Sequence, residues 1–139
     1  GDIALVPGPF MKNPQGIRDV AEWYMATRSR KDFIKAVFAC QCEIGIENLK
    51  RIHARVGDRV DAVFLCGPDF GTQTSSFCSD ATLRELWLPY YTKVNTWIHS
   101  NTTWKCFKHS CGSVERFFES FIDPLEAGLG IKSSHTIGR

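Results

Sequence analysis

His109 and Cys111 place an imidazole and a thiol two positions apart, and this pair is the strongest candidate for chemistry in the 139-residue chain. Side chains at positions i and i+2 of an extended segment point to the same side, so both can address one metal ion. Zinc suits such a pair because Zn²⁺ binds thiolate sulfur and imidazole nitrogen, and a catalytic zinc generally has three protein ligands. Taken alone, a His-x-Cys pair is more often a coincidence of sequence than a metal site.

A second candidate is the loop of residues 67–73, which carries the carboxylate of Asp69 and the amide of Gln73. In parallel α/β folds the functional groups gather where strands end and loops begin. We expect Asp69 to position a substrate or to hydrogen-bond a metal-bound histidine, and Gln73 to line the same mouth. A turn or helix-capping role accounts for Asp69 equally well.

Other reactive or aromatic side chains have plainer explanations. Cys40 and Cys42 lie in a helical pattern, where residues i and i+2 diverge, so we do not expect them to share a metal. His53 and His99 lie near the ends of predicted helices, which favours a surface or capping role. Aromatic residues at helical spacing are usually core rather than a tetrapyrrole site, and this applies to Trp87, Tyr90, Tyr91 and Trp97.

The elements that must position these residues follow from the periodicity of apolar side chains. Predicted strands cover residues 3–6, 60–66 and 104–108, and predicted helices cover 16–25, 31–52, 79–101 with a kink at Pro89, and 114–122 capped by Ser113. Buried strands that alternate with helical crossovers pair in parallel, so the predicted class is α/β, either a doubly wound sheet or a barrel. A complete (β/α)8 barrel takes about 250 residues. The sequence therefore predicts one domain with three or four strand-helix units, which is incomplete as a barrel.

Composition narrows the partners to small molecules. The chain is 43% hydrophobic with a formal net charge of +2, which is ordinary for a globular domain and gives no basic stripe for nucleic acid or an anionic membrane. No apolar run approaches the roughly 20 residues that span a bilayer, and Gly1-Asp2-Ile3 lacks the basic region of a signal peptide. The six cysteines lie mostly in apolar or periodic segments, so we expect reduced thiols and a cytoplasmic protein.

Several short motifs recur in register over about sixty residues and carry a family resemblance. They are residues 67–73, Asp80 to Glu85, Pro89-Tyr90-Tyr91, Ile98-His99 and Phe107 to Val114. In order and spacing these motifs resemble the uroporphyrinogen decarboxylase and cobalamin-dependent methyltransferase superfamily. True decarboxylases of that superfamily lack the His-x-Cys pair, so the chain is most similar to the zinc methyltransferase branch.

The resemblance implies a partial TIM (β/α)8 barrel over residues 1–139, with zinc held by His109 and Cys111. It also implies methyl transfer between a corrinoid, either methylcobalamin or a corrinoid protein, and a small methyl donor or thiol acceptor. Asp69 would then be the catalytic residue, binding substrate together with Gln73. The alternatives are a tetrapyrrole decarboxylase of the same fold and a non-catalytic truncated fragment.

The sequence departs from the family pattern at two places. Pro68 stands where the family usually has an acidic residue, so a role that needs paired carboxylates is not supported. Residues 124–139 match nothing in the family, where a second cysteine completes the zinc site, and His135 is at best an improvised substitute. We therefore expect the chain as given to lack a third ligand, to be catalytically inactive on its own, and to bind zinc weakly or not at all. We also expect it to self-associate through the uncovered edges of a partial barrel.

Overall fold

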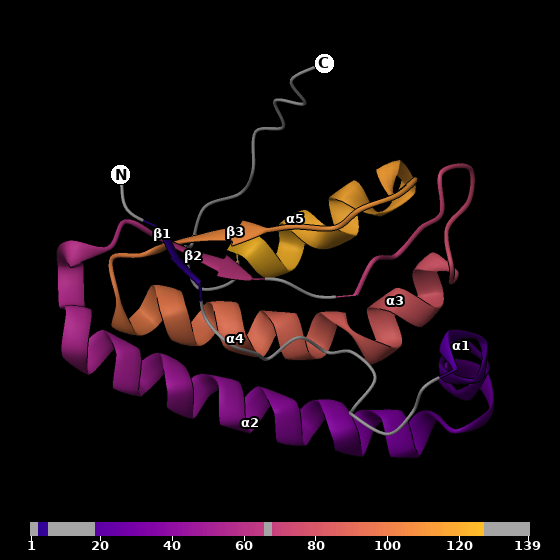
Figure 1. Ribbon diagram of the computed structural model, residues 1–139, viewed down its shortest axis with the longest axis horizontal. Coiled ribbons are helices and arrows are strands. Elements are labelled where there is room, and N and C mark those ends of the chain that lie inside the picture. Colours follow the sequence, from indigo (N-terminus) through magenta and orange to yellow (C-terminus); the bar gives the residue numbers. More distant parts are fainter. Residues whose placement is uncertain (1–2, 6–18, 66–67, 127–139) are drawn as a thin grey trace.

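The computed structural model of the chain describes residues 3–5, 19–65 and 68–126. Its centre is a parallel sheet in the order β1 (Ile3–Leu5), β2 (Ala62–Leu65) and β3 (Lys105–Lys108) (Figure 1). The register sets Val63 beside Cys106 and Leu65 beside Lys108. Parallel pairing between strands separated by helices confirms the predicted α/β class, whereas a closed barrel is not shown by the described residues.

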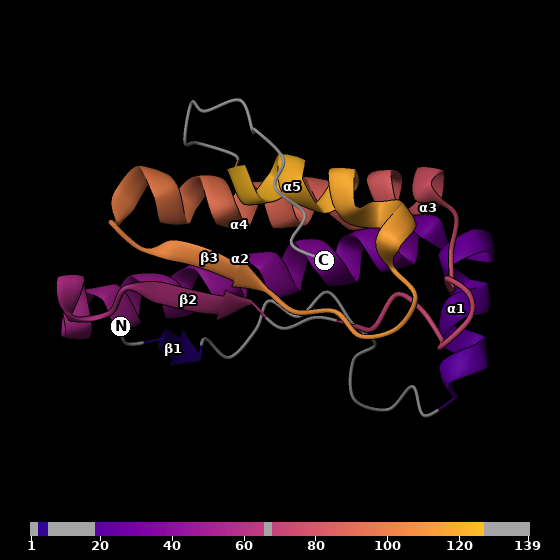
Figure 2. The same ribbon diagram turned by 90° about the horizontal axis from the view of Figure 1, so that it is seen from above.

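Five α-helices and two short 3-10 helices accompany the sheet within the described residues. They are α1 (Val20–Ser29), α2 (Lys31–Val56), η1 (Gly57–Arg59), α3 (Asp80–Leu86), α4 (Leu88–Asn101), η2 (Glu115–Phe117) and α5 (Phe118–Glu126). Helices α2 and α4 pack together on the same side of the sheet, and α5 lies along α4 (Figures 1 and 2). None of the described helices combines the length and the apolar character needed to cross a lipid bilayer.

The two faces of the sheet differ because side chains alternate along each strand. Val63 and Leu65 are buried on the side of α2 and α4, whereas Phe64 and Phe107 point to the other side. The rings of Phe64 and Phe107 stack with centroids 5.4 Å apart, and Phe107 is 53% exposed. Among the described residues, no helix covers this second face (Figures 1 and 2).

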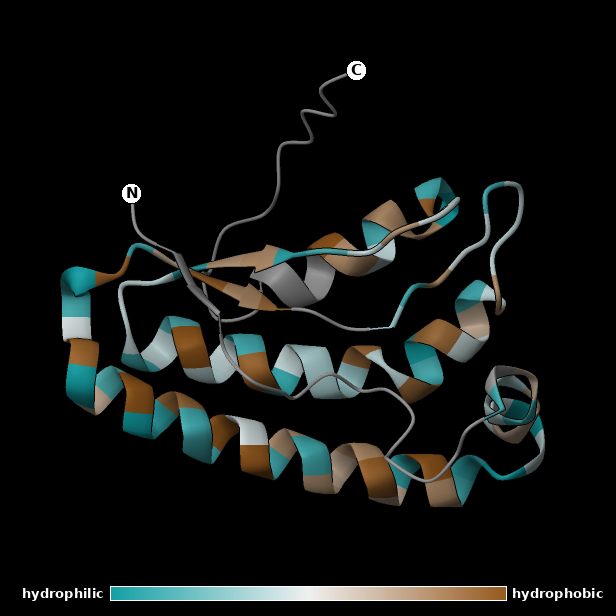
Figure 3. Cartoon of the chain, in the orientation of Figure 1, coloured by the Kyte–Doolittle hydropathy of each residue, from teal (hydrophilic) through white to brown (hydrophobic). Residues whose placement is uncertain are grey.

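The core between the helices and the sheet is rich in aromatic rings. Phe38 on α2 is fully buried, and its ring lies 5.4 Å from that of Trp87 and 5.9 Å from that of Trp23. Apolar residues recur along α2 and α4 between hydrophilic ones, as the surface helices of a packed domain require (Figure 3). Trp87 and Tyr91 are buried, and Tyr90 and Trp97 pack partly buried against the same core, which confirms their predicted role.

Side-chain hydrogen bonds to backbone N–H groups fix the starts of α1 and α3. Helix α1 begins at Val20 because the Asp19 carboxylate accepts the backbone N–H groups of Ala21 at 2.7 Å and Glu22 at 3.2 Å. The predicted start at residue 16 lies outside the described residues. Ser79 caps α3 as predicted, since its Oγ accepts the N–H of Thr82 at 3.1 Å.

Two details of the predicted helices are wrong. The segment expected as one kinked helix over 79–101 is two helices, α3 and α4, with the break at Trp87. Pro89 has no N–H to bond to the carbonyl four residues earlier, so it is accommodated in the first turn of a new helix. Ser113 does not cap a helix at Val114; its N–H donates to the Thr72 carbonyl at 2.7 Å, and α5 begins only at Phe118, after η2.

Replacement of Phe38 by alanine should destabilise the fold strongly. The change removes a fully buried ring and leaves a cavity between α2 and α4, so the free energy of unfolding should fall by about 3–5 kcal/mol. Phe33, on the same helix but 44% exposed, is the matched control, and Phe33→Ala should change that free energy by less than about 0.5 kcal/mol. Urea denaturation followed by circular dichroism measures both, and equal losses would mean that the core is not centred on Phe38.

Candidate metal centre

The ends of β2 and β3 bring three potential metal ligands together. The His109 N–H continues the ladder beyond β3 by donating to the Leu65 carbonyl at 3.4 Å, and Asp69 follows β2. The His109 Nε2 and Cys111 Sγ atoms are 3.0 Å apart. One ligand atom each from Asp69, His109 and Cys111 lies within 4.8 Å of the others. The carboxylate, imidazole and thiol thus form one cluster, which we call the Asp-His-Cys triad.

Asp69 is held from two directions. Its Oδ1 accepts the backbone N–H of Cys111 at 3.0 Å, and its own carbonyl accepts the Tyr24 hydroxyl of α1 at 2.9 Å. Burial raises the pKa of Tyr24 to about 12, so this hydroxyl stays protonated and donates throughout the neutral range. One carboxylate oxygen therefore fixes the Cys111 loop, which leaves the second oxygen as the potential metal ligand.

The loops that follow β2 and β3 touch backbone to backbone at two glycines. Gly112 has φ = +85°, and a Cβ at that position would lie 2.0 Å from the Gly71 carbonyl oxygen. A Cβ at Gly71 would lie 2.7 Å from the Ser113 carbonyl oxygen. Any side chain at either position would separate the loops, so both glycines are required for the close approach.

Lys108 is a residue of this region that the sequence reasoning did not single out. Its Nζ donates to the His109 carbonyl at 2.7 Å and lies 5.0 Å from the ring centroid of Tyr91, 5.7 Å from that of Phe70 and 5.9 Å from that of Phe121. A cation among aromatic faces is attracted by their quadrupoles. The signal in the sequence was a lysine at a helix-facing position of a strand, where an apolar side chain is usual.

The donor set of the triad fits zinc. A tetrahedral zinc with bonds of about 2.0 Å to nitrogen and 2.3 Å to sulfur separates those two ligands by about 3.5 Å, so the 3.0 Å contact need open only slightly. All three residues are exposed, which lets a metal and a small ligand reach them from solvent. The sequence pattern offered no third ligand, whereas the structure brings the Asp69 carboxylate close enough to be a potential third donor. The weak zinc binding expected from the sequence stays a prediction. His135, the substitute considered from sequence, lies outside the described residues.

Gln73 lies exposed in a turn closed by the Thr72 N–H, which donates to the Ser75 carbonyl at 2.7 Å. Its expected role at the mouth of the site stays a prediction. Pro68, which departs from the family pattern, is partly buried just ahead of Asp69. The carboxylate of this loop that reaches the triad is therefore that of Asp69 alone.

The other described cysteines lack the surroundings of a metal site. Burial raises the pKa of the Cys106 thiol to about 12 and that of Cys78 to about 11, and it also raises the pKa of Cys42, so these thiols stay protonated at neutral pH. Cys106 Sγ lies 3.4 Å from His99 Nε2, but among the described residues no third ligand joins this pair. Cys40 and Cys42 lie on α2, with Cys40 exposed and Cys42 buried, as the helical pattern predicts.

Comparison with known proteins leaves the family open. No protein family, no curated protein and no solved structure matches this chain. The triad geometry and the sequence motifs are therefore the features that bear on function.

The close contact between Gly71 and Gly112 predicts that adding a single methyl group at Gly112 disrupts the two loops. Gly112→Ala should push the two loops apart, so the Cys111 and Ser113 amides should lose protection from hydrogen exchange as their bonds to Asp69 and Thr72 break. Gly57 is the matched control, because its φ is also positive, at +52°, while a Cβ there meets nothing within 4 Å.

Both alanine variants should lose about 1–2 kcal/mol of stability from backbone strain alone. Only Gly112→Ala should change the exchange of the loop amides, measured by nuclear magnetic resonance. Unchanged protection at Cys111 in that variant would contradict the proposed role of the contact.

Proposed function

We propose that the chain is a zinc-binding methyltransferase module in which Asp69, His109 and Cys111 hold the metal. The observation that carries this proposal is the convergence of the three donors at the ends of adjacent parallel strands. The resemblance of the sequence motifs to the zinc methyltransferase branch suggests the reaction, in which a methyl group passes between a corrinoid and a thiol. When bound, zinc stabilises the thiolate form of a thiol acceptor at neutral pH.

The residues of the chain have separate tasks in this proposal. His109 and Cys111 supply nitrogen and sulfur ligands, and Asp69 supplies an oxygen ligand while its other oxygen holds the Cys111 amide. Lys108 fixes the His109 carbonyl, which limits rotation of the histidine backbone. Three protein ligands leave one position of a tetrahedral zinc for the acceptor.

The arrangement of helices supports a barrel-like setting for this site. Helices α2 and α4 lie on one side of the sheet, as helices do around a (β/α)8 barrel, whereas a doubly wound sheet has helices on both faces. The face with Phe64 and Phe107 would then line the barrel interior. We further propose a cytoplasmic location, as expected from cysteines that lie mostly in apolar or periodic segments.

Zinc titration tests the ligand set directly. The protein should bind one zinc per chain, and His109→Ala or Cys111→Ala should each lower the affinity by more than about 100-fold, beyond the usual effect of losing a residue behind a ligand. Asp69→Asn should lower it by at least about tenfold. Exposed residues of the same type on α2 give matched controls, so Cys40→Ala and Asp32→Asn should leave the affinity unchanged. Equal binding by wild type and Cys111→Ala would refute the proposed site.

Methyl transfer tests the reaction separately from metal binding. The zinc-loaded protein with methylcobalamin and a small thiol should form the thioether, with the absorbance change of corrinoid demethylation. The rate should disappear on removal of zinc and in Cys111→Ala, and it should persist in Cys40→Ala. Zinc binding without methyl transfer would support the metal centre but contradict the methyltransferase function. Decarboxylation of a tetrapyrrole carboxylate by the same protein would favour the decarboxylase alternative.

A further inference from the structure

A polar hollow of about 340 Å³ lies between α1, the start of α3 and η2, apart from the triad. Arg28 of α1 and Arg116 of η2 line it, together with hydroxyl groups that include those of Ser76 and Thr82. Arg116 donates to the Ser76 hydroxyl at 3.2 Å, which holds its guanidinium at the wall. Neither Asp69, His109 nor Cys111 contributes to the lining.

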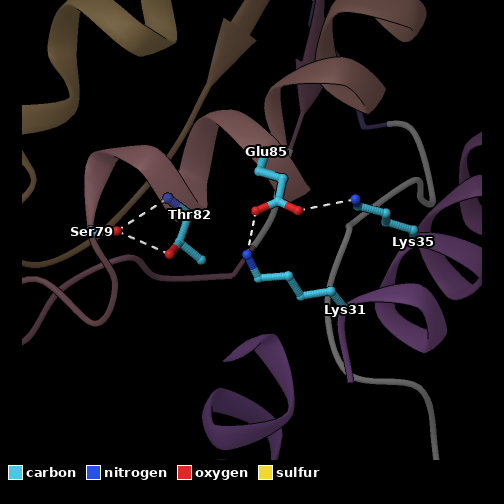
Figure 4. A network of polar contacts seen from close by, with 5 residues as sticks. All are labelled: Lys31, Lys35, Ser79, Thr82 and Glu85. Atoms are coloured by element: carbon cyan, nitrogen blue, oxygen red, sulfur yellow. Dashed lines mark hydrogen bonds and ion pairs between the residues drawn. The ribbon is translucent and has the colours of Figure 1, made fainter. Parts of the chain in front are cut away.

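The hollow carries positive charge without a matching carboxylate in its lining. The Asp80 carboxylate interacts with Arg116 but lies outside the lining, where it accepts the Ser120 hydroxyl at 2.6 Å and Arg84 Nε at 2.7 Å. Glu85 points to α2 and is paired with Lys31 and Lys35 (Figure 4).

Glu115 lines an adjoining open hollow of about 560 Å³ that shares Ser76 and Arg116 with the first. This acid stands outside the smaller hollow. The lining of the smaller hollow thus has a net charge of two positive units, from its two arginines, when its other groups are neutral.

Those other groups are neutral at physiological pH. Burial raises the pKa of the Cys78 thiol to about 11 and that of the Tyr24 hydroxyl to about 12, so neither opposes an anion. The rings of Tyr24 and Phe77 stack on each other 4.5 Å apart at 19°, and both contribute apolar surface to the lining of the hollow. The Ser79 and Thr82 hydroxyls contact each other at 3.0 Å at the start of α3 (Figure 4).

We propose that this hollow binds a phosphomonoester, with the phosphate between Arg28 and Arg116 and a planar or apolar body against Tyr24 and Phe77. Guanidinium groups match the oxygens of phosphate in pairs, and hydroxyls complete the shell. The volume is at the lower end of the range of about 300–1,000 Å³ for small-molecule sites, which is larger than a bare phosphate needs.

The site stands independently of zinc, because none of its residues belongs to the triad. It nevertheless adjoins the triad through one residue, since the Tyr24 hydroxyl in its wall donates to the Asp69 carbonyl. A ligand that contacts Tyr24 would therefore be linked to Asp69 through the Tyr24 hydroxyl, and Asp69 in turn accepts the Cys111 N–H.

Titration with three probes tests the proposal. Phenyl phosphate should bind saturably and more tightly than inorganic phosphate, whereas phenol, which lacks the charge, should not bind. Chemical-shift changes should centre on the amides around Arg28, Ser76 and Thr82. Inorganic phosphate that binds as tightly as phenyl phosphate would support the site and identify the ligand as the free oxyanion.

Arginine variants distinguish specific binding in the hollow from nonspecific attraction of the phosphate to a positively charged surface. Arg28→Gln and Arg116→Gln should each weaken phenyl phosphate binding by at least about tenfold, as expected for the loss of a hydrogen bond to a charged group. Arg51→Gln removes the same charge from an exposed position on α2 and should change the affinity less than twofold. Arg28 and Arg116 are both exposed, so either variant carries the test if the other fails to fold. Equal weakening by Arg28→Gln and Arg51→Gln, or binding of phenol as tight as that of phenyl phosphate, would overturn the proposal.

Discussion

The contact between the backbones of Gly71 and Gly112 is the constraint on which the candidate metal centre depends. It joins the loop after β2 to the loop after β3 at a separation that admits no side chain. Because the loops meet there, the Asp69 carboxylate reaches the Cys111 amide, and the thiol of the same residue lies beside His109. The triad is thus a property of two touching loops rather than of either motif alone.

The core supports these loops through a short chain of rings. Phe70, which is 1% exposed, follows Asp69 directly and packs edge-on to Trp87 at 5.3 Å, so the backbone of Asp69 is anchored by its neighbour. The same Phe70 lies under the ammonium group of Lys108, which in turn holds the His109 carbonyl. The buried aromatic residues therefore fix both sides of the triad, although the triad itself is exposed.

Much of this arrangement could be predicted from the sequence, because it follows from local patterns. Apolar runs at 60–66 and 104–108 predicted parallel strands, and spacing of two residues predicted that His109 and Cys111 share a side, which the 3.0 Å contact confirms. The break at Trp87 was missed because a proline can kink a helix or begin one, and tertiary packing decides between them. The nearness of Asp69 to His109 was predicted, because both follow the ends of neighbouring parallel strands. Its hydrogen bond to the Cys111 amide was not predicted, because that contact joins residues about forty positions apart.

The central claim is that one carboxylate, one imidazole and one thiolate from this chain bind a single zinc. X-ray absorption at the zinc edge of the loaded protein tests it most directly. The account predicts one sulfur at about 2.3 Å, with the other ligands being nitrogen or oxygen at about 2.0–2.2 Å. In Cys111→Ala the sulfur should vanish from the spectrum. A shell with two or more sulfurs, or a sulfur that persists in Cys111→Ala, would contradict the account.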